Sequence, residues 1–199
     1  MRPGSQTTTL RDRKRERSRV LTAETAWRLF IERGYDNVTV ADICAAAEIA
    51  PRTFHRYFTG KDDVVAEPVR YMTSLVAGQI SAAPPEMSDS RALRGAIHEL
   101  GVFVLGHRDW LAALRTVVQQ SHHLRETHSG VPPERERELS TMLAARKNME
   151  PDWRQRLLVA CSVAAFRIWY DDYLRGGLVD PLGRLDEMMA AASRPGLDS

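Results

Sequence analysis

The sequence predicts an all-α protein in which three short helices precede a larger helical bundle. Apolar residues recur at helical spacing along most of the 199-residue chain, and no alternating run of β-branched and aromatic residues is long enough for a strand. Capping residues, glycines and prolines divide the pattern into about nine helices. The longest apolar run, 157–168, contains Ser162 and Arg167 and is too short to span a membrane.

The first two predicted helices have clear boundaries. The first carries a stripe of apolar residues and ends at Gly34, and its stripe consists of Ala23, Ala26, Trp27 and Phe30. The second begins where Thr39 is followed three residues later by Asp42, which is a capping-box-like start.

Pro51 fits the first position of a third helix that runs to about Phe58. Thr59 and Asp62 open a fourth helix, which is predicted to continue unbroken to about Ile80 and to link the two parts of the chain. Five more helices are predicted at residues 92–105, 110–124, 134–148, 151–175 and from 181 onward.

Positive charge is concentrated at the amino terminus. Residues 1–19 contain seven basic and two acidic side chains, whereas residues 20–61 are balanced and residues 62–199 are acidic overall. We therefore expect a flexible basic arm at 1–19, a first domain at 20–66 and a second at 67–199. Such an arm suits a phosphate backbone, although a solvated tail is the alternative.

The third helix is predicted to have two opposed faces. Arg52, His55 and Arg56 fall within roughly 100° of arc, and Phe54 and Phe58 lie about opposite. A short helix anchored by two phenylalanines after a capped helix and a tight turn is typical of a helix-turn-helix, whose second helix enters the DNA major groove. The alternative is a basic, solvated face without a partner.

A spaced set of residues between Ala26 and Val65 is more specific. It comprises Phe30, Gly34, Tyr35, Thr39, Val40, Ile43, Ala47, Thr53, Phe54, Tyr57, Phe58 and Lys61. The set resembles the DNA-binding domain of TetR-family transcriptional regulators, and its segment from Pro51 to Phe54 resembles an actinobacterial branch. The close match covers about forty residues of the chain, and the resemblance implies a sequence-specific regulator, by family default a repressor.

The resemblance also implies roles for individual residues. Thr39 and Lys61 would contact phosphates, and a recognition set would meet bases or backbone: Arg52, Thr53, His55 and Tyr57. Arg56 would face the groove or pair internally. The sequence departs from the family pattern in three places, with Glu48 where glycine is frequent, Ala50 in place of a Ser or Thr cap, and His55 in place of tyrosine. The missing cap should cost about 1 kcal/mol.

For the rest of the chain, the resemblance implies a helical ligand-binding and dimerisation domain whose last two helices form a four-helix bundle across a two-fold axis. The helix 157–174 agrees, because it is apolar on nearly all sides. The predicted dimer interface contains Val163, Phe166, Tyr170, Leu182, Leu185 and Met189. The candidate effector pocket contains Tyr71, Leu75, Phe103, His107, Trp110, Leu114, Met142 and Phe166. The alternatives are a monomeric core helix and plain core residues.

Together with the resemblance, these observations predict a cytoplasmic homodimer that binds a palindromic operator and an unknown small-molecule effector, without cofactor, metal or membrane partner. An enzyme is disfavoured, because no nucleophile elbow or nucleotide-binding loop occurs and His122, His123 and His128 lack further metal ligands. A helical small-molecule carrier or antirepressor that has lost specific DNA binding is the other alternative. Cys44 and Cys161 are expected to be buried free thiols.

Overall fold

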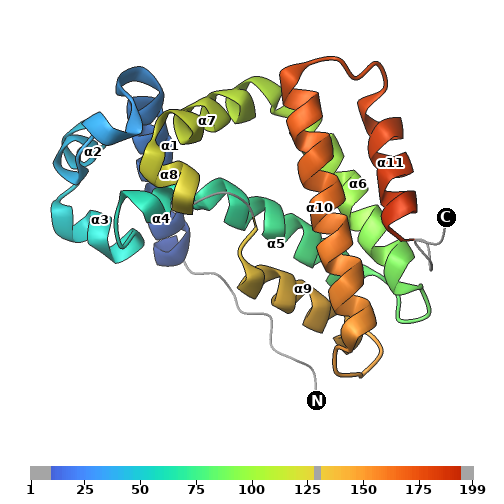
Figure 1. Ribbon diagram of the computed structural model, residues 1–199. Helices are drawn as coiled ribbons and strands as arrows, with labels where there is room; N and C mark the ends of the chain where they lie inside the picture. The colour runs from blue at the N-terminus through green and yellow to red at the C-terminus, as the bar shows by residue number, and fades with distance from the viewer. Residues whose placement is uncertain (1–9, 128–130, 194–199) are drawn as a thin grey trace. The chain divides into compact units, whose positions relative to one another are not determined.

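The computed structural model describes residues 10–127 and 131–193, and this part of the chain is helical and contains no strand (Figure 1). The all-α prediction is therefore confirmed. The first nine residues of the predicted arm and His128 lie outside the described residues. The elements are α1 (Leu10–Arg33), the 3-10 turn η1 (Tyr35–Asn37), α2 (Val40–Ala46), α3 (Pro51–Tyr57), α4 (Lys61–Val65), α5 (Glu67–Ala82), α6 (Asp89–Gly106), α7 (Arg108–Gln120), α8 (His122–Thr127), α9 (Pro133–Ala145), α10 (Trp153–Arg175) and α11 (Pro181–Ala192).

The chain divides into two compact units. The first is formed by the described parts of residues 1–67 and by residues 113–127, and the second by residues 68–112 and the described parts of 128–199. The predicted division at residue 66 did not include segment 113–127 in the first unit. This segment packs there through the buried side chains of Val117 and Leu124 and through Ser121, whose hydroxyl donates to Asp36 at 2.9 Å.

Helix α1 begins at Leu10, well before the predicted boundary at residue 20. The segment 10–19 has no regular apolar stripe, but it consists largely of arginine, lysine and glutamate, which favour a helix, and it contains no glycine or proline. An ion pair between Glu16 and Arg19, one turn apart at 2.8 Å, adds support. The described part of the expected flexible arm is therefore helical.

Two predicted helices are each divided, so the described chain has eleven α-helices instead of about nine. The first break, at Ala66, precedes Pro68, which has no N–H and whose ring would clash with the carbonyl of Val64 in a continuous helix. The second break is at Ser121, whose hydroxyl accepts a hydrogen bond from the N–H of Leu124 at 3.4 Å and caps α8.

The first unit is built around aromatic side chains. Helix α1 packs against α2 and α4, and α2 packs against α3. The buried rings of Trp27 and Phe30 meet edge to face with centroids 5.6 Å apart, and Phe30 lies 5.2 Å from Tyr35. This core fixes α2 and α3 relative to α1.

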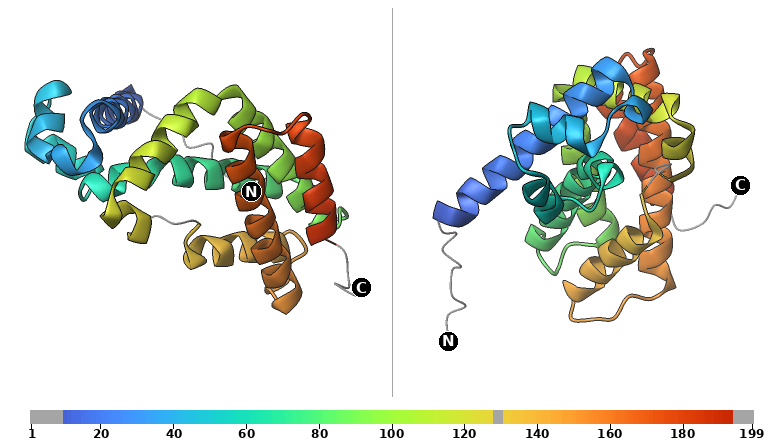
Figure 2. Two further views of the ribbon diagram at one scale, coloured as in Figure 1. Left: turned by 45° about the horizontal axis from the view of Figure 1, so that its top comes forward. Right: turned by 90° about the vertical axis from the view of Figure 1, so that its left-hand side faces the viewer.

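In the second unit α10 packs against α6, α9 and α11, and Figures 1 and 2 show it beside α6 and α11. Trp169 is fully buried, and its Nε1 donates to the carbonyl of Pro181 at 2.6 Å. Gly101 of α6 allows α11 to approach closely, because a Cβ at this position would lie 2.5 Å from Cδ2 of Leu185. No helix of the described chain is long and apolar enough to cross a membrane.

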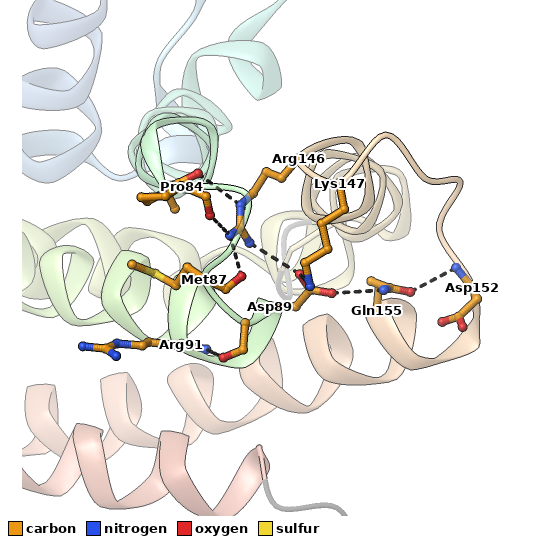
Figure 3. A network of polar contacts seen from close by, with 10 residues as sticks. Pro84, Met87, Asp89, Arg91, Arg146, Lys147, Asp152 and Gln155 are labelled. Atoms are coloured by element: carbon orange, nitrogen blue, oxygen red, sulfur yellow. Dashed lines mark hydrogen bonds and ion pairs between the residues drawn. The ribbon is translucent and has the colours of Figure 1, made fainter.

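A buried arginine holds the loop between α5 and α6 (Figure 3). The Arg146 side chain is 4% exposed, and it donates to the carbonyls of Ala83, Pro84 and Met87 at 3.3, 2.6 and 2.8 Å. Its guanidinium also lies 3.4 Å from Asp89, which binds Lys147 at 2.9 Å and Gln155 at 3.0 Å. The network therefore ties this loop to the end of α9 and the start of α10.

Candidate nucleic-acid interface

Helix α2 begins with the predicted capping box. The Thr39 hydroxyl accepts from the N–H of Asp42 at 3.1 Å, and the Asp42 carboxylate accepts from the N–H of Thr39 at 2.8 Å. The Thr39 hydroxyl and the Thr39 N–H both donate to the Asp42 carboxylate, and these two hydrogen bonds hold the pKa of Asp42 below its usual value. The box satisfies N–H groups at the start of α2, a position that also favours a bound anion.

The turn between α2 and α3 contains two of the departures from the family pattern. Glu48 has a φ of 53°, in the left-handed region that glycine adopts most easily. Ala50 is the N-cap of α3 and makes no side-chain capping bond, as the sequence predicts, whereas Pro51 occupies the first turn. The turn is therefore less stabilised locally than one with glycine and serine at these positions.

Helix α3 has the two predicted faces. Phe54 and Phe58 are buried, with ring centroids 5.5 Å apart, and they attach the helix to the core. Arg52, His55 and Arg56 are exposed on the other side. The helix can therefore present cations and hydrogen-bond donors to a groove without disturbing its own packing.

Arg56 and Tyr57 form a local pair. The Arg56 guanidinium lies 5.0 Å from the centroid of the Tyr57 ring and donates to the Tyr57 hydroxyl at 3.0 Å. Hydrogen bonds from Ser18 and Arg56, with the positive charges of Arg56 and Arg15 nearby, hold the pKa of Tyr57 below its usual value. Of the two roles predicted for Arg56, this geometry corresponds to internal pairing.

The contact between Ser18 and Tyr57 attaches α1 to the end of α3. The amino-terminal half of α1 carries exposed cations: Arg11, Arg13, Lys14, Arg15 and Arg17. A shallow groove runs beside them, with Lys14, Arg17 and Leu21 on α1 and with Ala47 and Ile49 at the turn after α2. Within the described residues, the cations predicted as a flexible arm are therefore fixed on a helix that contacts α3. The run of helix-forming residues without a breaker is the sequence signal that identifies this extension.

Lys61 is more constrained than its predicted phosphate contact suggests. Its ammonium donates to the carbonyl of Tyr35 at 2.9 Å and lies 4.1 Å from the centroid of the Tyr35 ring. An ammonium has three donors, so this contact leaves capacity for a phosphate. Thr53 is half-buried on α3.

The predicted pocket residues are only partly brought together. In the second unit the Phe103 ring stacks on His107 at 4.2 Å and lies 5.3 Å from the ring of exposed Tyr71. Leu114 is buried and belongs to the first unit. The other predicted members are partly or largely exposed in the second unit: Leu75, Trp110, Met142 and Phe166.

The predicted dimer interface also requires a correction. Leu185 and Met189 are 0% and 1% exposed within the unit itself, since Gly101 admits α11 to the core. The other four predicted residues are half-buried: Val163, Phe166, Tyr170 and Leu182. The exposed apolar side chains of α10 lie on another face, at Trp153, Leu157 and Ile168.

The first unit presents a cationic helix, α3, which follows a capped helix, and the chain continues into a second helical unit. This arrangement defines a helix-turn-helix DNA-binding protein. Residues 23–67 match the model of the tetR family of bacterial regulatory proteins. The HTH-type transcriptional regulator TcmR of Streptomyces glaucescens is 29% identical over 173 residues, which cover 81% of this chain and 76% of that relative. By this similarity, residues 23–67 form a DNA-binding domain of the TetR type, and the chain resembles a transcriptional regulator over most of its length.

Solved structures share the fold. A transcriptional regulator from Pseudomonas aeruginosa PAO1 has a TM-score of 0.60 at 17% identity, over 89% of this chain and 88% of that chain. A TetR-family regulator from Streptomyces coelicolor has a TM-score of 0.54 at 16% identity, over 88% of this chain and 96% of that chain.

Proposed function

We propose that the protein is a repressor that binds a palindromic operator as a homodimer and leaves it when a small-molecule effector binds. The observation that carries the proposal is the exposed face of α3, where Arg52 and His55 project from a helix fixed by buried Phe54. Such a face suits base edges in a major groove. A protein with this role acts in the cytoplasm, and the proposal assigns it no catalytic step.

Within this proposal the DNA-binding domain comprises residues 20–66, preceded by the cationic part of α1, and the rest of the chain holds effector and partner. Arg52 reads a base, whereas Thr39 and Lys61 hold phosphates at the starts of α2 and α4. Thr53, His55 and Tyr57 contribute further base or backbone contacts. Arg56 acts through its pairing with Tyr57.

The first test is a titration of the purified protein on its own upstream intergenic DNA and on a scrambled fragment at several salt concentrations. We expect a preference for the native fragment of at least about a thousandfold, with affinity that falls steeply as salt rises, because cations displace condensed counterions. No binding to either fragment at low salt would contradict the proposal and favour the antirepressor alternative.

We propose that the second copy covers an exposed stripe on α10, formed by Trp153, Leu157 and Ile168, with half-buried Ala164 between them and Cys161 at its edge. At 100° per residue these side chains share roughly 80° of arc. Trp153, Leu157 and Ile168 are 61%, 54% and 51% exposed, which is unusual for large apolar side chains. A palindromic operator requires a two-fold symmetric protein, and a self-complementary helix face supplies the contact.

Cys161 provides the measurement for this interface. It is partly exposed, contrary to the expectation of two buried thiols, whereas Cys44 is buried and burial raises the pKa of its thiol. A short bis-maleimide is therefore expected to produce a covalent dimer of the wild type and none of Cys161→Ser. If the protein sediments as a dimer that cannot be cross-linked, and if the dimer persists in Leu157→Glu, the interface lies elsewhere.

We propose that the effector binds beside the Tyr71, Phe103 and His107 cluster, which offers stacked rings and an imidazole in the second unit. Compounds that release the native fragment in the titration should fail to do so with Phe103→Ala. An unchanged response of that variant would refute this location.

A further inference from the structure

Helix α8 contributes a histidine to the DNA-binding unit from a distant part of the sequence. The Nε2 atom of His123 lies 2.8 Å from a carboxylate oxygen of Asp62 in α4. The imidazole is also nearly parallel to the ring of Tyr35, with an interplanar angle of 16° and centroids 6.3 Å apart. His123 thus contacts both α4 and η1.

These two partners are linked to Lys61, a proposed phosphate contact. The Tyr35 hydroxyl donates to the Asp62 carboxylate, and the Tyr35 carbonyl accepts from Lys61 at 2.9 Å. Burial and the neighbouring Asp62 raise the pKa of Tyr35, so its hydroxyl remains protonated and continues to donate at neutral pH. A chain of contacts therefore runs from His123 through Asp62 and Tyr35 to the Lys61 ammonium.

Helix α8 is fixed to the unit by contacts that do not involve His123. The Ser121 hydroxyl donates to Asp36 at 2.9 Å, and Leu124 is fully buried. The His123 side chain itself is half exposed. Its replacement should therefore leave the fold intact and remove the contacts of the imidazole with Asp62 and with the Tyr35 ring.

We propose that His123 is a positioning residue for DNA binding, which holds Asp62, Tyr35 and thereby Lys61 in place. The inference rests on the proposed DNA contact of Lys61. It gives helix α8 a part in DNA binding that requires no effector.

The test measures the affinity of the full-length protein for its upstream DNA fragment. His123→Ala is expected to weaken binding by about threefold to fivefold, as suits a half-exposed contact. His122→Ala is the matched control, because His122 is the neighbouring residue on α8, is exposed, and faces Glu126 at 3.5 Å. It should bind like the wild type.

His123→Gln tests the hydrogen bond by a conservative change. Its amide can donate to Asp62, so this variant should recover most of the affinity that His123→Ala loses. A loss in His123→Gln as large as that in His123→Ala, or equal affinities of His123→Ala and His122→Ala, would overturn the proposal.

Thermal unfolding of the same proteins distinguishes a failure of the proposed function from a failure of the positioning role of His123. If the wild type shows no preference for the native fragment but His123→Ala lowers the melting temperature, the contact stabilises the unit and the role in DNA binding is refuted. If the wild type binds specifically and its affinity does not depend on His123, the proposed function stands and the positioning role is refuted.

Discussion

Replacing Arg146 by alanine is expected to lower the free energy of unfolding by about 3 to 5 kcal/mol, the usual cost of removing one partner from a buried charged network. The substitution leaves the carbonyls of Ala83, Pro84 and Met87 without their donor. It also leaves Asp89 with Lys147 and Gln155 as its remaining partners in this network. Denaturant unfolding followed by circular dichroism measures the loss.

The control for this prediction is Arg154→Ala. Arg154 also pairs with a carboxylate, that of Asp152 at 3.1 Å, but its side chain is 68% exposed. Its loss should change the free energy of unfolding by no more than about 1 kcal/mol. If the two substitutions lower the free energy of unfolding equally, burial does not determine how much the Arg146 network stabilises the protein.

Phe54→Ala is expected to lower the free energy of unfolding by about 3 to 5 kcal/mol and to abolish specific DNA binding. The Phe54 ring is fully buried and meets the ring of Phe58, and these two side chains attach α3 to the core. Without it a cavity remains and α3 is no longer held in one orientation. Thermal unfolding and the titration on upstream DNA measure the two effects.

Arg52→Ala is the matched control on the same helix. Arg52 is exposed, so the melting temperature should change little, whereas specific affinity should fall by about 1 to 3 kcal/mol if the side chain reads a base. Phe54→Leu should restore most of both properties, because leucine refills much of the cavity. Full operator affinity of Phe54→Ala would show that this anchor does not position the recognition helix.

Local sequence patterns predicted the DNA-binding unit well for a physical reason. The Thr39 capping box, the Pro51 start and the two faces of α3 depend on residues within one or two turns of each other. Such signals act over short distances and can be recognised in the chain itself. The missed extension of α1 was also local, but helix-forming charged residues do not produce an apolar stripe.

The sequence-based predictions were wrong where contacts between residues far apart in the chain determine the structure. Leu185 and Met189 have the same apolar pattern whether they face a partner or their own core, and the approach allowed by Gly101 places them in the core. The assignment of residues 113–127 to the first unit depends on Ser121 meeting Asp36 and on His123 meeting Asp62. No periodicity in either segment encodes such a pairing.

The sequence by itself determined the all-helical class, the helix-turn-helix and the residues that α3 exposes, because caps, prolines and amphipathic spacing act within single helices. Only the tertiary structure decided which downstream helices join the DNA-binding unit, which face of α10 remains open and which side chains Arg146 holds. These features depend on contacts between residues far apart in the chain, and a pattern within one helix specifies that it has an apolar face but not what covers that face.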